Sequence, residues 1–145
     1  MREILFRGKN KKTNEWVYGS YVNDGHEHPY IKESYDKDTE FSTFQLLASF
    51  GYLNEHVYVK EETVGQFTGL LDKNNQRIFE HDIIKFRQYI CDKYCFGSVS
   101  FENGEFGISW IDEDKDYRFC PLNFDFYEKV EILGNVFDNP NSFHN

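Results

Sequence analysis

The dipeptide Asn103-Gly104 constrains the fold of this chain more than any other feature, because it lies between two alternating segments at residues 97–110. A two-residue type I′ turn needs a positive φ at both positions, which asparagine and glycine tolerate, so the dipeptide predicts a β-hairpin. This loop length also fixes the register of the hairpin. The predicted apolar pairs are Val99–Ile108 and Phe101–Phe106. The opposite face carries Ser98, Ser100 and Ser109, and we expect it to contact water.

Strand patterns extend along the chain on both sides of this hairpin. Alternation at residues 3–7 and 16–19 surrounds a polar turn at residues 8–14, further strands are predicted within residues 63–86, and a last strand is predicted within residues 130–140. One short helix is predicted near residues 43–50, since Ser42 can cap it and Gln45 completes a capping box. The sequence therefore predicts a mainly β, β-rich α+β fold with this one short helix.

Two small packed β lobes are predicted within one compact unit. The N-terminal lobe, residues 1–62, contains the short helix and a variable loop, and the second lobe spans residues 63–145. The chain has 16 basic and 25 acidic residues and is 19% aromatic. A net charge of −9 argues against a basic nucleic-acid-binding module, and the aromatic content indicates a folded core.

Neither a long apolar run nor the apolar region of a signal peptide is found, so we expect a cytoplasmic protein in a bacterial host. The cysteines Cys91, Cys95 and Cys120 are odd in number, which favours reduced thiols over a disulfide framework. A zinc site made by these cysteines and His81 is a weaker alternative, since paired ligand spacings are missing.

Four sequence blocks resemble the YopX protein family of phage and prophage genes in their order and spacing. They are FRGKNKKTNEWVYGSYV at 6–22, TVGQFTGLLDKNNQRIFEHDII at 63–84, NGEFGI at 103–108 and EILGNVFDNP at 131–140. Where the family usually has NG and EGD, this chain has Asn74-Asn75 and Glu80-His81-Asp82. Asparagine and histidine are enriched among non-glycine residues with positive φ, so both turns are expected to form.

The resemblance implies a phage-derived, mostly β protein whose C-terminal half is similar to a small SH3-like barrel. Self-association is a further implied alternative. The resemblance brings no activity, and it transfers no catalytic, cofactor-binding or metal-binding residues to this chain.

The first candidate interaction site is a basic hairpin tip that contains Lys9, Lys11 and Lys12. One interpretation is a solvated turn whose lysines discourage pairing at a sheet edge. Contact with phosphate groups is the alternative.

The second candidate is the acidic run that contains Asp112, Asp114 and Asp116, which begins like a calcium-binding loop. Tyr117 stands where that loop needs glycine, and Asn123 stands where it needs a bidentate glutamate. We therefore predict a solvated acidic turn, with weak cation binding as the alternative.

Two histidine-containing segments are weaker candidates. His26 and His28 could share one face of a strand and bind a metal, but Gly25 and Pro29 favour a loop. In Glu80-His81-Asp82, a histidine between carboxylates suits acid–base chemistry, yet Asp82 fits better as an acceptor for turn amides. No cofactor or metal is predicted.

Nucleophile-elbow, phosphate-loop and dinucleotide-binding patterns are all missing from the sequence, so we do not expect an enzyme. The leading hypothesis is a non-catalytic accessory protein that binds a host or phage protein. The alternatives are a nucleic-acid-binding accessory protein that uses exposed aromatic residues and the basic tip, and a structural, self-assembling protein.

Overall fold

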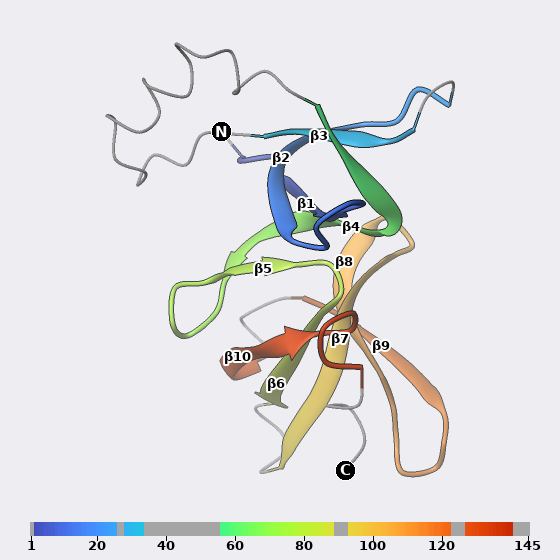
Figure 1. Ribbon diagram of the computed structural model, residues 1–145. Coiled ribbons are helices and arrows are strands. Elements are labelled where there is room, and N and C mark those ends of the chain that lie inside the picture. The colour runs from blue at the N-terminus through green and yellow to red at the C-terminus, as the bar shows by residue number, and fades with distance from the viewer. Residues whose placement is uncertain (1, 26–27, 34–55, 89–92, 123–126, 141–145) are drawn as a thin grey trace. The chain divides into compact units, whose positions relative to one another are not determined.

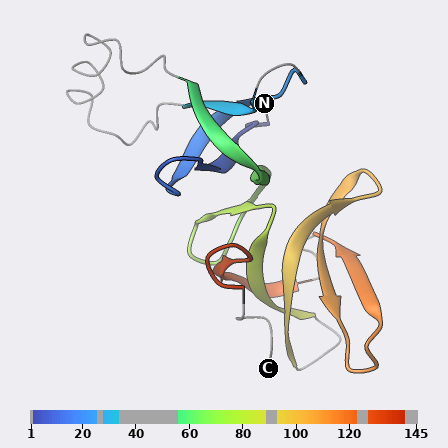
Figure 2. The same ribbon diagram turned by 45° about the vertical axis from the view of Figure 1, so that its right-hand side comes forward.

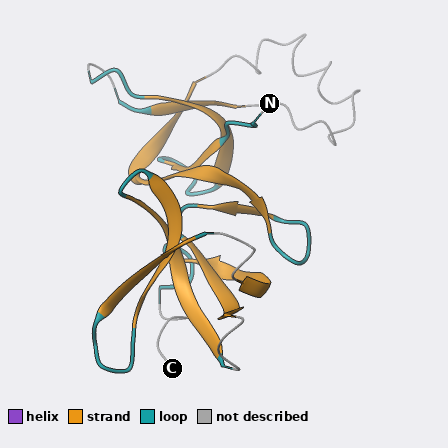
Figure 3. Ribbon diagram, turned by 180° about the vertical axis from the view of Figure 1, so that it is seen from behind, coloured by secondary structure: helices purple, strands orange, loops and turns teal. Residues whose placement is uncertain are grey.

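A computed structural model describes residues 2–25, 28–33, 56–88, 93–122 and 127–140 (Figure 1). All regular elements in these ranges are β-strands, which confirms the mainly β class (Figure 3). The strands are β1 (Phe6–Asn10), β2 (Trp16–Val22), β3 (Tyr30–Glu33), β4 (His56–Leu71), β5 (Arg77–Phe79), β6 (Asp82–Gln88), β7 (Tyr94–Glu102), β8 (Glu105–Ile111), β9 (Tyr117–Pro121) and β10 (Tyr127–Asn135). The helix predicted near residues 43–50 lies outside the described residues.

The chain divides into two units, Met1–Gln66 and Phe67–Asn145. This division falls inside β4, the strand that also contains the predicted boundary between residues 62 and 63. Over the described ranges, no helix has the length and apolar character needed to cross a membrane.

In the first unit, four antiparallel strands pair in a closed ring. β1 pairs with β2, β2 with β3, β3 with β4, and β4 again with β1. The side chains packed together are Val17, Ile31 and Val59, with Tyr21, Val57 and Val64 against them. A Cβ at Gly8 would lie 3.2–3.3 Å from atoms of Val59, Val64 and Ile31, so glycine allows β1 to lie close to this core.

The second unit contains an antiparallel sheet with the strand order β10-β6-β7-β8-β9. In addition, β5 pairs with the end of β4, where Phe67 lies opposite Phe79. The core consists of Ile78, Ile84, Phe86, Val99, Ile108 and Val130. The likeness of this half to an SH3-like barrel stays a prediction.

The β7–β8 hairpin has the predicted register, with Val99 opposite Ile108 and Phe101 opposite Phe106. Asn103 and Gly104 have φ values of 52° and 83°, as the type I′ turn requires. Val99 and Ile108 are almost completely buried, whereas Phe101 is 52% exposed. Phe101 lies next to Glu102, one of the two glutamates that flank the Asn103-Gly104 turn. The apolar face of the hairpin is therefore only partly covered at its tip.

The prediction that the serine face of this hairpin contacts water is wrong for Ser109, which is 9% exposed. The reason is β9, which pairs with β8 as a third strand (Figure 2). Phe119 of β9 lies directly opposite Ser109 in the register, so its side chain lies on the same face. A Cβ at Gly107 would collide with the Phe119 ring, which shows that this ring covers the glycine. Aromatic side chains of β9 therefore cover much of the serine face.

The turn at residues 72–76 is held by one buried carboxylate. Asp72 Oδ1 accepts hydrogen bonds from the backbone N–H groups of Asn74 (2.8 Å) and Gln76 (2.9 Å). Asp72 Oδ2 accepts a third bond from the N–H of Ile132 in β10 (3.1 Å). Asn75 has a φ of 62°, which confirms the positive φ expected at this turn. Asp72 thus fastens the β4–β5 turn to the neighbouring sheet.

Candidate functional site

The basic tip predicted near the N-terminus separates into one buried lysine and two exposed ones. Lys9 is only 7% exposed, because β1 continues to Asn10 and pairs Lys9 with Trp16 of β2. The Lys9 Nζ atom lies 5.3 Å from the centre of the Trp16 ring, and its backbone N–H donates to Thr63 Oγ1 (2.8 Å). The expectation that Lys9 belongs to a solvated tip is therefore wrong, since cation–π contact and strand pairing hold it inside.

Lys11 and Lys12 lie in the turn between β1 and β2 and are exposed. Asn10 Oδ1 accepts a hydrogen bond from the Lys12 N–H (2.8 Å), and Asn14 occupies a position with a φ of 62°. The turn is thus stabilised by asparagines, which leaves the two lysine side chains at the surface.

The metal-site alternatives gain no support from the described part of the chain, where no group of three or more His, Cys, Asp or Glu residues could hold a metal ion. His26 and Cys91 lie outside the described residues. Cys95 and Cys120 are partly buried and pack against the core of the second unit. His28 is exposed, and its ring makes an edge contact with Tyr58 at 6.2 Å.

The cluster Glu80-His81-Asp82 forms the tight turn between β5 and β6. Asp82 is buried, and its Oδ2 accepts a hydrogen bond from the Phe79 N–H (2.8 Å), which is the bonding predicted for it. His81 has a φ of 73°, and its N–H donates to the Val99 carbonyl (2.8 Å). The Val136 N–H donates to the His81 carbonyl (3.0 Å). These contacts join the turn to other parts of the second unit.

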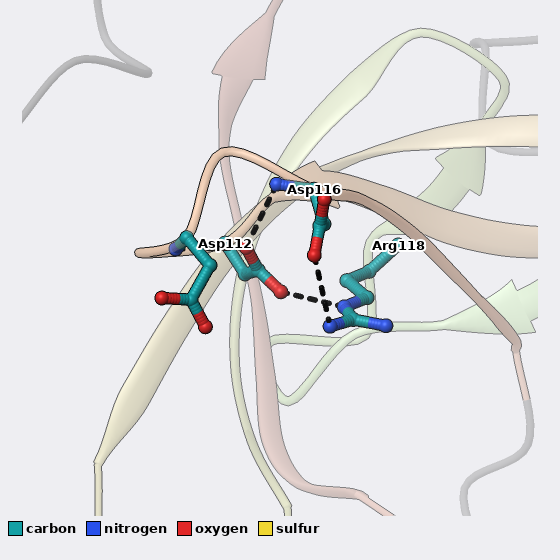
Figure 4. Close-up of polar contacts among 4 residues, drawn as sticks. Asp112, Asp116 and Arg118 are labelled. Atoms are coloured by element: carbon teal, nitrogen blue, oxygen red, sulfur yellow. Dashed lines mark hydrogen bonds and ion pairs between the residues drawn. The ribbon is translucent and has the colours of Figure 1, made fainter.

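The acidic run forms the turn between β8 and β9, and Asp112 organises it (Figure 4). Asp112 Oδ1 accepts hydrogen bonds from the N–H groups of Asp114 (3.0 Å) and Asp116 (2.9 Å). Arg118 Nε lies 2.6 Å from Asp112 Oδ2, and Arg118 Nη2 lies 3.7 Å from Asp116 Oδ2. Asp112 is therefore engaged within the turn, while the carboxylates of Asp114 and Asp116 belong to exposed residues.

The pKa of Asp112 is lowered, first by the hydrogen bond from the Asp116 backbone and then by Arg118. A carboxylate with a lowered pKa stabilises the folded state above its ordinary pKa of 3.8, and this contribution is lost as the pH falls through the folded-state pKa. We expect Asp112→Asn to lower the free energy of unfolding near neutral pH, and the difference from wild type to shrink below about pH 4.

Urea titrations of both proteins across this pH range measure that difference. Glu113→Gln is the matched control, because the Glu113 side chain is 95% exposed and its carboxylate lies 3.9 Å from the exposed ammonium of Lys93. This control should behave as wild type at every pH. A difference between Asp112→Asn and wild type that does not change with pH would contradict the assignment.

An exposed apolar pair lies beside the acidic turn. Ile111 of β8 and Tyr117 of β9 are opposite each other in the register and are 62% and 55% exposed. The Tyr117 hydroxyl donates to Glu102 Oε1 (2.6 Å), and this bond raises the pKa of Tyr117. Ile111, Tyr117 and Glu102 are called the Ile111–Tyr117 surface below. The sequence pattern alone does not indicate this surface, because Ile111 and Tyr117 come together only through the pairing of β8 with β9.

A second surface, which the sequence pattern did not predict, lies on β3 and β4 of the first unit. His28, Tyr30, His56 and Tyr58 form a continuous set of ring contacts there. The available signal was the repeated pattern His-x-Tyr, at residues 28–30 and 56–58. This pattern does not by itself predict the surface, because the sequence signal for a strand begins only near residue 63, whereas β4 begins at His56.

The fold and these surfaces define an all-β protein with two antiparallel units in its described part. The crystal structure of YopX from Bacillus subtilis is similar, with a TM-score of 0.57 at 14% identity and 100% of both chains covered. The crystal structure of EF1440 from Enterococcus faecalis gives a TM-score of 0.55 at 20% identity, with 99% of this chain and 100% of that chain covered. These likenesses concern the fold alone.

The YopX protein family matches residues 5–143. The chain therefore belongs to the YopX protein family. Among curated proteins, none matches it.

Proposed function

We propose that this chain is a non-catalytic, phage-derived accessory protein that binds a protein partner in the bacterial cytoplasm through the Ile111–Tyr117 surface. The observation that carries the proposal is the pairing of Ile111 and Tyr117, two large side chains that lie opposite each other and are both more than half exposed. Large exposed apolar groups surrounded by polar residues are typical of protein interaction sites.

The surface is ordered before any partner arrives. Glu102 holds the Tyr117 hydroxyl at 2.6 Å, and Arg118 holds Asp112 at the same distance beside Ile111. Fixing these side chains in advance reduces the conformational entropy that binding would otherwise remove. Tyrosine is also well suited as an anchor, since it offers a large contact area with few rotatable bonds.

The charge around the surface favours a protein partner over a nucleic acid. Exposed residues of the adjoining turn include Glu113, Asp114 and Asp116. This acidic rim would repel phosphate groups and attract a partner that has lysine or arginine around an apolar patch.

The proposal contains no catalytic step. Among the described residues, the cluster most suited to acid–base chemistry by sequence is Glu80-His81-Asp82, and its Asp82 carboxylate bonds to the Phe79 amide. A structural role for this turn fits its backbone bonds from His81 to Val99 and Val136.

Affinity capture with immobilised variants tests the proposed site. Ile111→Asp and Tyr117→Ala should each weaken capture of the partner by at least about tenfold relative to wild type. Leu133→Asp is the matched control, because Leu133 is an exposed apolar residue of β10 in the same sheet, at 43% exposure. It should capture the partner as well as wild type does.

Three outcomes would overturn the proposal. Wild type could capture no reproducible partner, or all three variants could capture one equally well. In the third outcome, light scattering would show a wild-type oligomer that Ile111→Asp dissociates, so that the surface binds a second copy of this chain rather than another protein.

A further inference from the structure

The outer face of β3 and β4 in the first unit carries a continuous array of aromatic rings. The Tyr30 and His56 rings are stacked, with centres 3.9 Å apart and planes inclined by 9°. Tyr30 also makes an edge contact with Tyr58 at 6.4 Å, and Tyr58 makes one with His28 at 6.2 Å. We call these four residues the aromatic array.

Strand alternation explains why the rings gather on one side. Tyr30 lies directly opposite Tyr58, so the two side chains point to the same face of the pair. The intervening residues Ile31, Val57 and Val59 point the other way and pack in the core of this unit. The array therefore cannot turn inward without moving the core residues outward.

Three of the four residues of the array are exposed, and Tyr30 is half-buried. Tyr58 is 46% exposed, and His28 and His56 are both exposed residues. The stacked Tyr30–His56 pair also restrains both rings in one orientation, so the array presents ordered ring faces and edges.

Lysines border the array. Lys32 lies opposite His56 in the register and is exposed. The Lys11 N–H donates to the Tyr58 carbonyl (2.9 Å), which places this exposed turn lysine next to Tyr58 along the β1–β4 edge. The Lys60 ammonium donates to Asn14 Oδ1 (2.7 Å). Lys32 and Lys60 occupy the same alternation positions as Tyr30 and Tyr58, so their side chains extend toward the face of the array, in a chain whose net charge is −9.

Two described carboxylates adjoin these lysines in the sequence. Glu33 follows Lys32, so strand alternation directs its side chain away from the face of Tyr30 and Lys32. Glu61 lies beyond Lys60 and accepts a hydrogen bond from Asn23 Nδ2 (3.2 Å).

We propose that the aromatic array and its lysines bind single-stranded nucleic acid. Unpaired bases stack on exposed aromatic rings whatever their sequence, and lysines beside the rings contact the phosphates. Duplex DNA offers no free base faces to such a platform. This binding is separate from the proposed protein partner, because it uses residues of the first unit only.

Fluorescence anisotropy with a labelled oligodeoxythymidine of about 12 nucleotides tests this proposal. Contacts from Lys11, Lys32 and Lys60 to phosphate predict a loss of affinity of roughly twentyfold between about 50 and about 200 mM salt. Tyr58→Ala should weaken binding by about tenfold, and Tyr58→Trp should retain it because the indole also stacks. Lys32→Glu should weaken binding and reduce its salt dependence.

Tyr94→Ala is the matched control, since Tyr94 is a tyrosine of the second unit with a similar exposure of 41%. Both Tyr94→Ala and Ile111→Asp should bind the oligonucleotide as wild type does, which separates this proposal from the protein-binding one. Thermal unfolding monitored by circular dichroism checks that Tyr58→Ala remains folded.

The proposal is wrong if the oligonucleotide does not bind at low salt, if Tyr58→Ala and Tyr94→Ala lose affinity equally, or if Tyr58→Trp binds no better than Tyr58→Ala. It is also wrong if polyglutamate displaces the oligonucleotide as effectively as unlabelled oligodeoxythymidine does. That last result would identify an acidic protein segment as the ligand.

Discussion

Replacing Phe86 with alanine is expected to lower the free energy of unfolding of the second unit by about 3–5 kcal/mol. Phe86 has no exposed surface and belongs to the core cluster of this unit. Its ring makes an edge contact with Trp110, with the ring centres 5.5 Å apart. Removing the ring takes away both its buried apolar area and this aromatic contact.

The cavity left by Phe86 is held open by its position in the sheet. β6 lies between β10 and β7, so both of its edges are fixed by backbone hydrogen bonds. A backbone held on both sides cannot collapse into the space, and substitutions at such sites lie at the upper end of the usual range.

Urea unfolding followed by Trp110 fluorescence, in a Trp16→Phe background, measures this loss in the second unit. Phe101→Ala is the matched control, because it removes the same side chain from β7 at a position that is 52% exposed. Phe101→Ala should lower the free energy of unfolding by clearly less than Phe86→Ala does. If Phe86→Ala does not fold, Phe86→Leu should fold with an intermediate stability. Equal losses for Phe86→Ala and Phe101→Ala would contradict the assignment of the core.

The contrast between Phe86 and Phe101 also shows how far the sequence could predict the fold. The Asn103-Gly104 turn is a local signal, and it correctly fixed the partner of Phe101 in the hairpin. Alternation assigned Phe101 to the apolar face, but it could not show how much of that face the rest of the chain covers. Burial depends on pairings between distant segments, which a local pattern does not contain.

The same limit explains the outcome at the candidate sites. The role of Asp82 in its turn was predictable, because an aspartate that bonds to nearby amides is a local motif. The burial of Lys9 was not predictable, since it depends on the pairing that places Trp16 opposite it. The aromatic array likewise depends on the pairing of β3 with β4, two segments separated by residues 34–55.

Replacing Asp72 with alanine is expected to lower the free energy of unfolding of the second unit by about 3 kcal/mol. Asp72 is 5% exposed, and its carboxylate accepts hydrogen bonds from the amides of Asn74, Gln76 and Ile132. Alanine would leave these donors without their acceptor, and the N–H of Ile132 belongs to a strand rather than to the turn itself. Urea unfolding followed by Trp110 fluorescence measures the loss.

Two controls separate the three hydrogen bonds. Asp72→Asn keeps one side-chain oxygen that can accept the two turn hydrogen bonds, but its amide N–H₂ cannot accept the bond from the Ile132 N–H. We therefore expect Asp72→Asn to lower the free energy of unfolding by less than Asp72→Ala does. Asp112→Ala removes an aspartate with the same pair of turn bonds, from the amides two and four residues later, and its other oxygen pairs with Arg118 of the adjoining strand β9 rather than with a strand amide such as that of Ile132. If Asp112→Ala destabilised the unit as much as Asp72→Ala does, the burial of Asp72 and its bond with β10 would not be needed to explain the effect. A markedly smaller loss at Asp112 assigns the difference to the burial of Asp72 and to its bond with β10.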